Sequence, residues 1–159
     1  MKITVLAVGK VKEKFFRDAL DEYRKRLSRY CRLEIVEVDD EQAPERLSPA
    51  QEEQIRDREG KALLKRIPPK AWCIALAIDG RKTDSPGFSR KLESLALAQK
   101  SHLVFLIGGS LGLSDEVQAR ADERISFSDM TFPHQLMRVI LLEQIYRAFK
   151  ISANEPYHK

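Results

Sequence analysis

The sequence has few cysteines, few histidines and no long apolar run, and each shortage excludes a class of protein. Its 159 residues include two cysteines and three histidines. Their scatter along the chain fits no zinc-binding pattern, so we predict no metal site and interpret Cys31 and Cys73 as reduced core thiols of a cytoplasmic protein. The apolar runs are far shorter than the about 20 residues that span a bilayer. Residues 1–9 resemble a strand ended by glycine and not a signal peptide.

The charge balance is mildly basic. There are 28 lysines and arginines against 24 acidic residues, which gives a net charge of +4. This excess is compatible with a polyanionic partner but does not identify one, because many basic proteins never bind nucleic acid. A chain of this length is expected to form one domain with a buried core.

Strand and helix patterns alternate along the chain. Short apolar or β-branched runs predict strands over residues 2–8, 33–38, 72–78 and 103–107, the third ending in a turn at Asp79–Gly80. Periodicity and capping signals predict helices over residues 12–30, from Ser48 to about 66, from Ser85, from Ser114 and over 134–151. The alternation predicts an α/β fold, with a mostly parallel sheet and helices on both faces.

A glycine-rich loop follows the strand at 103–107. Gly108, Gly109 and Gly112 let the backbone turn sharply and let a ligand approach closely. Open parallel sheets bind small molecules at the carboxyl ends of their strands, so we predict a ligand site over this loop. The loop lacks both the GK[ST] ending of a phosphate loop and the GxGxxG dinucleotide fingerprint.

A second loop, residues 127–134, leads into the last helix. Its apolar side chains would wall an adenine while backbone groups bind the edge of the base. His134 starts the helix, where the positive helix end favours a neutral ring. It is either a site residue or a helix-start histidine with no chemical role.

The last helix and the tail carry polar residues in unexpected places. Arg138 lies within a wide apolar arc, so it must find a carboxylate, a carbonyl or a ligand. Leu136 and Ile140 lie on the opposite face, which indicates either contact with a second subunit or scattered surface residues. The tail, residues 152–159, is too short to fold alone, yet it ends in side chains that suit base stacking, proton transfer and phosphate contact.

Four motifs together resemble the RlmH family, SPOUT-class methyltransferases that act on a pseudouridine of bacterial large-subunit (23S) rRNA. The motifs are Ile107-Gly108-Gly109-x-x-Gly112, Thr131-x-Pro133-His134-x-Leu136-x-Arg138, Glu143-Gln144-x-Tyr146-Arg147-Ala148 and Pro156-Tyr157-His158. The resemblance covers the whole chain. The departures are mild: Phe127 and Phe132 stand where leucine is expected, and Lys159 stands where arginine is common.

The resemblance implies one SPOUT domain over residues 1–159, with a C-terminal trefoil knot and S-adenosylmethionine as cofactor. It also implies a homodimer in which the tail of one subunit, residues 152–159, completes the other subunit's active site. The acceptor would be N3 of a pseudouridine in 23S rRNA on the assembled ribosome. Carried over by position, the cofactor contacts would be Leu76, Gly108, Phe127, Ser128, Asp129, Met130, Thr131 and Phe132.

Roles for three polar residues follow as hypotheses, because N3 must lose its proton before or during attack on the sulfonium methyl. Arg138 would stabilise the developing anion, His158 would accept the proton, and Tyr157 would stack on or orient the base. The RNA-binding face would be basic, with Lys10, Lys12, Lys14, Arg17, Arg24 and Arg147 as candidates.

Three other functions stay open at this point. A SPOUT enzyme that methylates tRNA would keep the knot and the cofactor. A non-catalytic RNA-binding or ribosome-assembly protein would need no affinity for S-adenosylmethionine. A generic nucleotide-binding α/β domain would bind ATP or NAD, against which the missing fingerprints argue. The residues alone do not identify the modified nucleotide.

Overall fold

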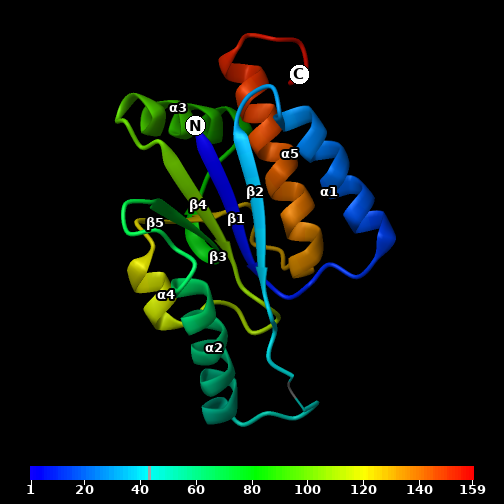
Figure 1. Cartoon of the computed structure of the whole chain (residues 1–159), viewed down its shortest axis with the longest axis vertical. Coiled ribbons are helices and arrows are strands. Elements are labelled where there is room, and N and C mark those ends of the chain that lie inside the picture. The colour runs from blue at the N-terminus through cyan, green and yellow to red at the C-terminus, as the bar shows by residue number, and fades with distance from the viewer. Residues whose placement is uncertain (43) are drawn as a thin grey trace.

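One sheet of five parallel strands forms the centre of the structure (Figure 1). The computed structural model describes residues 1–42 and 44–159. The strands stand in the spatial order β2-β1-β4-β3-β5, and every pairing is parallel. They are β1 (Lys2–Val8), β2 (Arg32–Val38), β3 (Trp72–Lys82), β4 (His102–Ile107) and β5 (Glu123–Ser126). The parallel α/β sheet predicted from the sequence is confirmed.

Helices cover both faces of this sheet, as predicted. One face packs against α1 (Lys14–Leu27), α3 (Ser85–Leu97) and α5 (His134–Ser152), and the other against α2 (Pro49–Leu64) and α4 (Asp115–Arg120). The central strands are therefore shielded on both sides. Residues 3–8 of β1 and 103–107 of β4 are all buried, which is why both read as continuous apolar runs.

Several helix ends follow the local signals in the sequence. Ser48 and Gln51 form a reciprocal capping box at the start of α2, and the Ser114 hydroxyl accepts the Val117 N–H at the start of α4. The start of α3 at Ser85 is as predicted, and Asp84 is its N-cap.

The strand that was predicted to end in a turn at Asp79–Gly80 is longer, because β3 continues past these residues to Lys82. The register against β5 shifts between Leu76 and Arg81, so the intervening residues form an irregularity inside the strand. A Cβ on Gly80 would lie 2.6 Å from the backbone carbon of Ile125. The glycine therefore marks a close approach of two backbones and not the end of a strand.

The last helix runs antiparallel to the strands. It begins near their carboxyl ends and finishes near their amino ends, so the C-terminal tail lies at the opposite end of the sheet from the glycine-rich loop (Figure 1). Glu155 N–H donates to the Lys150 carbonyl, and Asn154 adopts the left-handed conformation with φ of 54°. These contacts end α5 in the manner of a Schellman motif.

Candidate functional site

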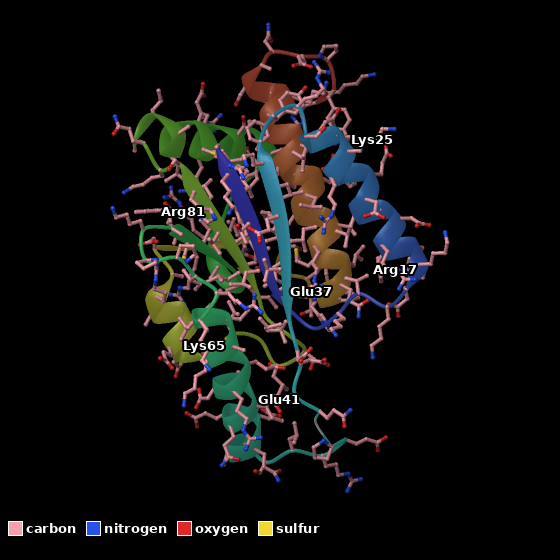
Figure 2. The ribbon with its side chains drawn as sticks, viewed as in Figure 1. Arg17, Lys25, Glu37, Glu41, Lys65 and Arg81 are labelled. Carbon is pink, nitrogen blue, oxygen red and sulfur yellow. The ribbon has the colours of Figure 1, made fainter. Side chains whose placement is uncertain are left out.

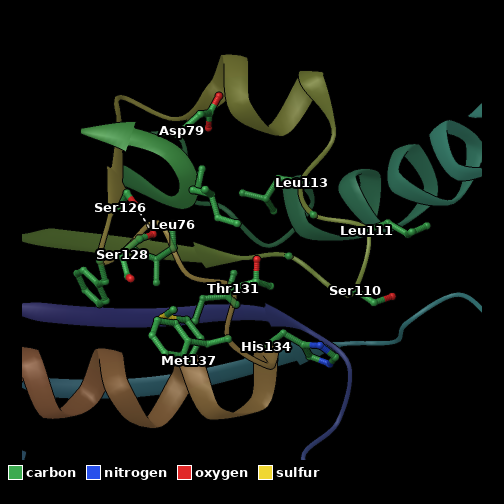
Figure 3. Close-up of a pocket in the computed structure, with 18 of the residues that line it drawn as sticks. Leu76, Asp79, Ser110, Leu111, Leu113, Ser126, Ser128, Thr131, His134 and Met137 are labelled. Atoms are coloured by element: carbon green, nitrogen blue, oxygen red, sulfur yellow. Dashed lines mark hydrogen bonds between the residues drawn. The ribbon is translucent and has the colours of Figure 1, made fainter. Parts of the chain in front are cut away.

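A cavity of about 1040 Å³ lies at the carboxyl ends of β3 and β4, where the sequence predicts a ligand site. Three stretches of chain enclose it: the end of β3, the glycine-rich loop after β4, and the loop between β5 and α5 (Figure 3). It is as large as ordinary small-molecule sites, which measure about 300–1,000 Å³. Seven of the eight residues predicted to contact a cofactor line it, namely Leu76, Gly108, Phe127, Ser128, Met130, Thr131 and Phe132.

The glycine-rich loop folds tightly on itself along one wall. A Cβ on Gly108 would lie 2.6 Å from the carbonyl carbon of Gly112, so no larger residue fits there without moving the loop. Gly112 has a φ of 83°, a conformation that side chains other than glycine rarely adopt. The N–H of Gly112 donates to the Gly109 carbonyl at 3.0 Å. At its glycines the loop therefore lets a ligand approach the backbone closely.

Serine hydroxyls hold the opposite wall in shape. Ser126 Oγ donates to the Ser128 carbonyl, and Ser128 Oγ accepts the Met130 N–H, both at 3.0 Å. Phe127 packs edge-on against Phe88 of the core with ring centroids 5.7 Å apart. Asp129 is the one predicted contact that does not line the cavity. It turns outward and pairs with Lys82.

His134 lines the cavity from the first turn of α5. Its pKa is lowered, chiefly because burial penalises the charged ring and secondly because the Arg138 guanidinium is near; Asp40 opposes both effects. The ring is therefore neutral at physiological pH, as predicted from its place at a helix start. A neutral imidazole at the cavity wall can accept or donate a hydrogen bond without adding charge.

Arg138 lies beneath the cavity and is not part of its lining. Its side chain is fully buried, and Nη1 donates to Glu37 Oε2 at 2.6 Å. Nη2 donates to the carbonyls of Val8 and Gly9, at 2.7 and 2.8 Å. The structure thus supplies a carboxylate and two carbonyls, the kinds of partner that the sequence requires. One donor is left over, because Nε is buried without a hydrogen-bond partner among the described residues.

The tail residues Tyr157 and His158 lie away from the cavity of their own chain. The Tyr157 hydroxyl donates to Glu143 Oε1 at 2.9 Å, and its ring packs edge-on against Tyr146. Burial, reinforced by Glu143, raises the pKa of Tyr157 to about 12, so the phenol stays protonated. Arg147 Nη1 lies 3.2 Å from His158 Nδ1. Because arginine only donates, this contact requires Nδ1 to be unprotonated.

The separation follows from the length of α5. The cavity touches this helix at its first turn, up to Met137, whereas the tail packs at the level of Tyr146. At a rise of about 1.5 Å per residue, these positions are about 14 Å apart along the helix axis. One protomer therefore does not bring the predicted cofactor contacts together with Tyr157 and His158, two of the three predicted catalytic residues.

Some of the cavity's residues were not singled out from the sequence. Ile78 is 54% exposed and lies at the cavity, with Arg56 of α2 adding a cation to the lining. Glu37 was missed as the partner of Arg138, because 101 residues separate them. The exposure of Ile78 has no local signal in the sequence, since only the fold shows that this residue is uncovered.

Across residues 1–42 and 44–159, no group of three or more histidine, cysteine, aspartate or glutamate side chains is arranged to hold a metal ion. Within the same residues no helix is both long and apolar enough to cross a membrane.

Comparison with known proteins identifies relatives of this chain. The sequence model of the family described as "Predicted SPOUT methyltransferase" matches residues 1–158. Proteins named ribosomal RNA large subunit methyltransferase H from Clostridioides difficile and Bifidobacterium adolescentis are 57% and 58% identical to this chain over 159 residues, with full coverage of both chains in each pair. The counterpart from Acetivibrio thermocellus is 52% identical over the same length.

A solved structure supports the fold independently of sequence. A probable methylase family protein from Haemophilus influenzae superposes with a TM-score of 0.58 at 11% identity, covering 99% of this chain and 70% of that one. At this identity the likeness concerns the fold alone.

Proposed function

The chain belongs to the SPOUT methyltransferase family, and on that premise we propose that it transfers a methyl group from S-adenosylmethionine to N3 of a pseudouridine in 23S rRNA. The observation that carries the proposal is the cavity at the carboxyl ends of β3 and β4, walled by the glycine-rich loop and the loop before α5. Family membership also implies the trefoil knot in the C-terminal part of the domain.

The residues of the cavity fit the cofactor. Glycines along one wall let an adenosyl group approach the backbone, and the collision that a Cβ on Gly108 would cause makes this wall specific to glycine. Leu76, Phe127 and Phe132 offer apolar surface for a purine, with the backbone of the same loop available for its polar edge. When bound, S-adenosylmethionine supplies an activated methyl group on a sulfonium.

The chain's own polar residues would then prepare the acceptor base. N3 of a pseudouridine carries a proton, which His158 accepts once Arg147 releases its Nδ1 lone pair. Tyr157, protonated and aromatic, stacks on the base and orients it. Arg138 stabilises the anion through its buried charge, while Glu37 and two carbonyls fix its position.

A homodimer would unite the two halves of this machinery. The tail of one protomer is remote from its own cavity, and the exposed Ile78 and Met130 flank that cavity with apolar surface. Leu136 and Ile140 of α5 are only partly buried within the protomer. A second copy that covers these residues would bring residues 152–159, including Tyr157 and His158, to its partner's cavity.

The substrate is the large ribosomal subunit's rRNA within the ribosome, and the protein acts in the cytoplasm where ribosomes are found. The support is the relatives' name, ribosomal RNA large subunit methyltransferase H, at 52–58% identity over full length.

The test of the reaction is methyl transfer from labelled S-adenosylmethionine to ribosomes purified from cells that lack the gene. Mass spectrometry of the digested 23S rRNA should show one added methyl, on N3 of a pseudouridine. Label found on tRNA alone would favour a different SPOUT enzyme. Absence of cofactor binding in calorimetry would favour a non-catalytic RNA-binding protein.

The test of the dimer uses two inactive variants. Deletion of Tyr157 to Lys159 should abolish methyl transfer and leave cofactor affinity within twofold, whereas a Gly108→Val chain should lose cofactor binding but keep its tail. Mixed in equal amounts under exchange, they should recover about one quarter of wild-type activity, because half of the dimers are mixed and each has one complete site. Full turnover by the deletion variant would exclude the role of the tail.

A further inference from the structure

A second groove, of about 560 Å³, lies between the end of β3 and the first turns of α3. Among the described residues that line it, four are cations, namely Arg81, Lys82, Arg90 and Lys91. The lining carboxylate is Asp84, and its Oδ1 is occupied as the N-cap of α3, where it accepts the Gly87 N–H at 2.7 Å. The groove therefore carries an excess of positive charge.

Two of the four cations have no carboxylate to neutralise them. Arg81 and Arg90 are exposed, and within residues 1–42 and 44–159 no acidic oxygen lies within 4.0 Å of either guanidinium. Lys82 pairs with Asp129, but both side chains are more than 60% exposed. Exposed ion pairs of this kind contribute little stability, so Lys82 can exchange its partner readily. The fourth cation, Lys91, pairs with Glu123 at 3.0 Å.

The groove is a neighbour of the cofactor cavity. Ile125 of β5 lines both. Lys82 of the groove bonds to Asp129, which belongs to the same loop that walls the cavity. A chain of phosphates lying in the groove would consequently run beside the place where the methyl acceptor must enter.

We propose that this groove binds the phosphate backbone of the RNA substrate and sets the register of the target nucleotide against the cavity. The inference rests on the proposed function, which makes RNA the substrate. Arginine, lysine and hydroxyl groups are the side chains that contact phosphates most, and Thr83 and Ser94 add hydroxyls to the lining. The positive end of the 13-residue α3 faces the same groove and adds to the potential.

A polyanion suits the groove better than a protein partner does. Ile125 is the one large aliphatic side chain without a charge among the described lining residues, whereas protein interfaces have an apolar core. The unpaired guanidinium groups offer planar forks that match phosphate oxygens.

The experiment compares Arg81→Ala/Arg90→Ala with Lys65→Ala/Arg66→Ala. The control removes two exposed cations from the end of α2, and Figure 2 shows Lys65 on that helix, apart from Arg81. Binding of each full-length protein to purified ribosomes is measured by co-sedimentation over a series of salt concentrations. Calorimetry with S-adenosylmethionine and size-exclusion chromatography accompany every variant.

We expect the groove variant to bind ribosomes at least tenfold more weakly, with cofactor affinity and dimerisation unchanged. Its slope of log affinity against log salt should be shallower by about 1.4–1.8, because two phosphate contacts are lost at about 0.7–0.9 each. The control should stay within twofold of wild type. Methyl transfer should show a raised KM for ribosomes and an unchanged kcat for saturating substrate.

Three outcomes would overturn the proposal. In the first, the groove variant binds ribosomes as tightly as the control does. In the second, it binds more weakly but its salt slope is unchanged. In the third, it no longer forms the dimer, which would make the groove a contact with a second copy. Failure of the proposed function has a different signature. In that case wild-type protein binds ribosomes with the expected salt dependence and the groove variant does not, yet no methyl group is transferred.

Discussion

Replacing Arg138 with methionine tests whether this buried cation stabilises the fold next to the candidate site. The side chain is fully buried, and it binds Glu37 and the carbonyls of Val8 and Gly9. Methionine keeps the apolar stem and removes every one of these bonds. Glu37 then remains with an uncompensated charge, although its side chain is 33% exposed and can recover some hydration.

The expected loss follows from these contacts. Breaking one partner of a buried ion pair costs about 3–5 kcal/mol, and the partial exposure of Glu37 places this pair at the lower end. We therefore expect the free energy of unfolding to fall by about 3 kcal/mol and the midpoint of thermal unfolding to fall by about 6–12 °C. Glu37→Gln is the matched control. It keeps the arginine, both carbonyl bonds and a neutral acceptor, so it should cost about 1 kcal/mol.

Urea unfolding at pH 7 and one fixed protomer concentration measures both variants, since the stability of a dimer depends on concentration. A loss below 0.5 kcal/mol for Arg138→Met would refute the structural role derived from its bonds. The kcat of methyl transfer is also measured for the folded fraction of each variant. If Glu37→Gln keeps kcat and Arg138→Lys loses it while remaining folded, the arginine acts on the reaction as well as on the fold.

Three further predictions concern the glycines and a histidine. Gly112→Ala should strain the loop by about 1–2 kcal/mol through backbone conformation alone, because φ is 83° and a Cβ would have no atom within 4 Å. Calorimetry should show that cofactor binding is weakened about tenfold, and an unaltered affinity would contradict this prediction. Gly60→Ala would place a Cβ 2.3 Å from Ser114 Oγ, so urea unfolding should show a loss of about 1–3 kcal/mol that adding Ser114→Ala partly restores. Burial lowers the pKa of His134 below the unfolded value of about 6.5, so the unfolded chain binds the proton more readily and stability falls as the pH drops through that value. Thermal unfolding between pH 5 and 8 should show a weaker pH dependence in His134→Gln, and identical curves for both proteins would count against the burial argument.

Local chemistry explains which parts of the fold the sequence could predict. The capping box of Ser48 and Gln51 lies within four residues, so its signal is complete in the sequence. The buried strand 103–107 and the glycines after it are similarly self-contained. The end of β3 was missed, because Asp79–Gly80 has the composition of a turn while its glycine serves a contact with Ile125, 45 residues away.

The candidate site likewise contains residues that could be predicted from the sequence and residues that could not. Seven of the predicted cofactor contacts line one cavity, and they were assigned by resemblance and not by periodicity. Asp129 is not in the cavity lining and pairs instead with Lys82 of β3, a contact that its sequence neighbours do not indicate. Helical periodicity found Arg138 in an apolar arc, but it could not name Glu37, since strand order alone brings β2 to that position. The roles of Tyr157 and His158 stay a prediction that only the assembled dimer can test.

The register of β1 has a consequence for biosynthesis. Lys2 pairs with Arg32 on one side and with His102 on the other, so the two neighbours of β1 in the sheet emerge from the ribosome far apart in time. At a synthesis rate of about 5–20 residues per second, several seconds pass between the emergence of β2 and that of β4, and one edge of β1 stays unpaired during this time. An open edge invites pairing with other chains, so early folding of this protein depends on dilution or on a chaperone that covers β1 until β4 arrives.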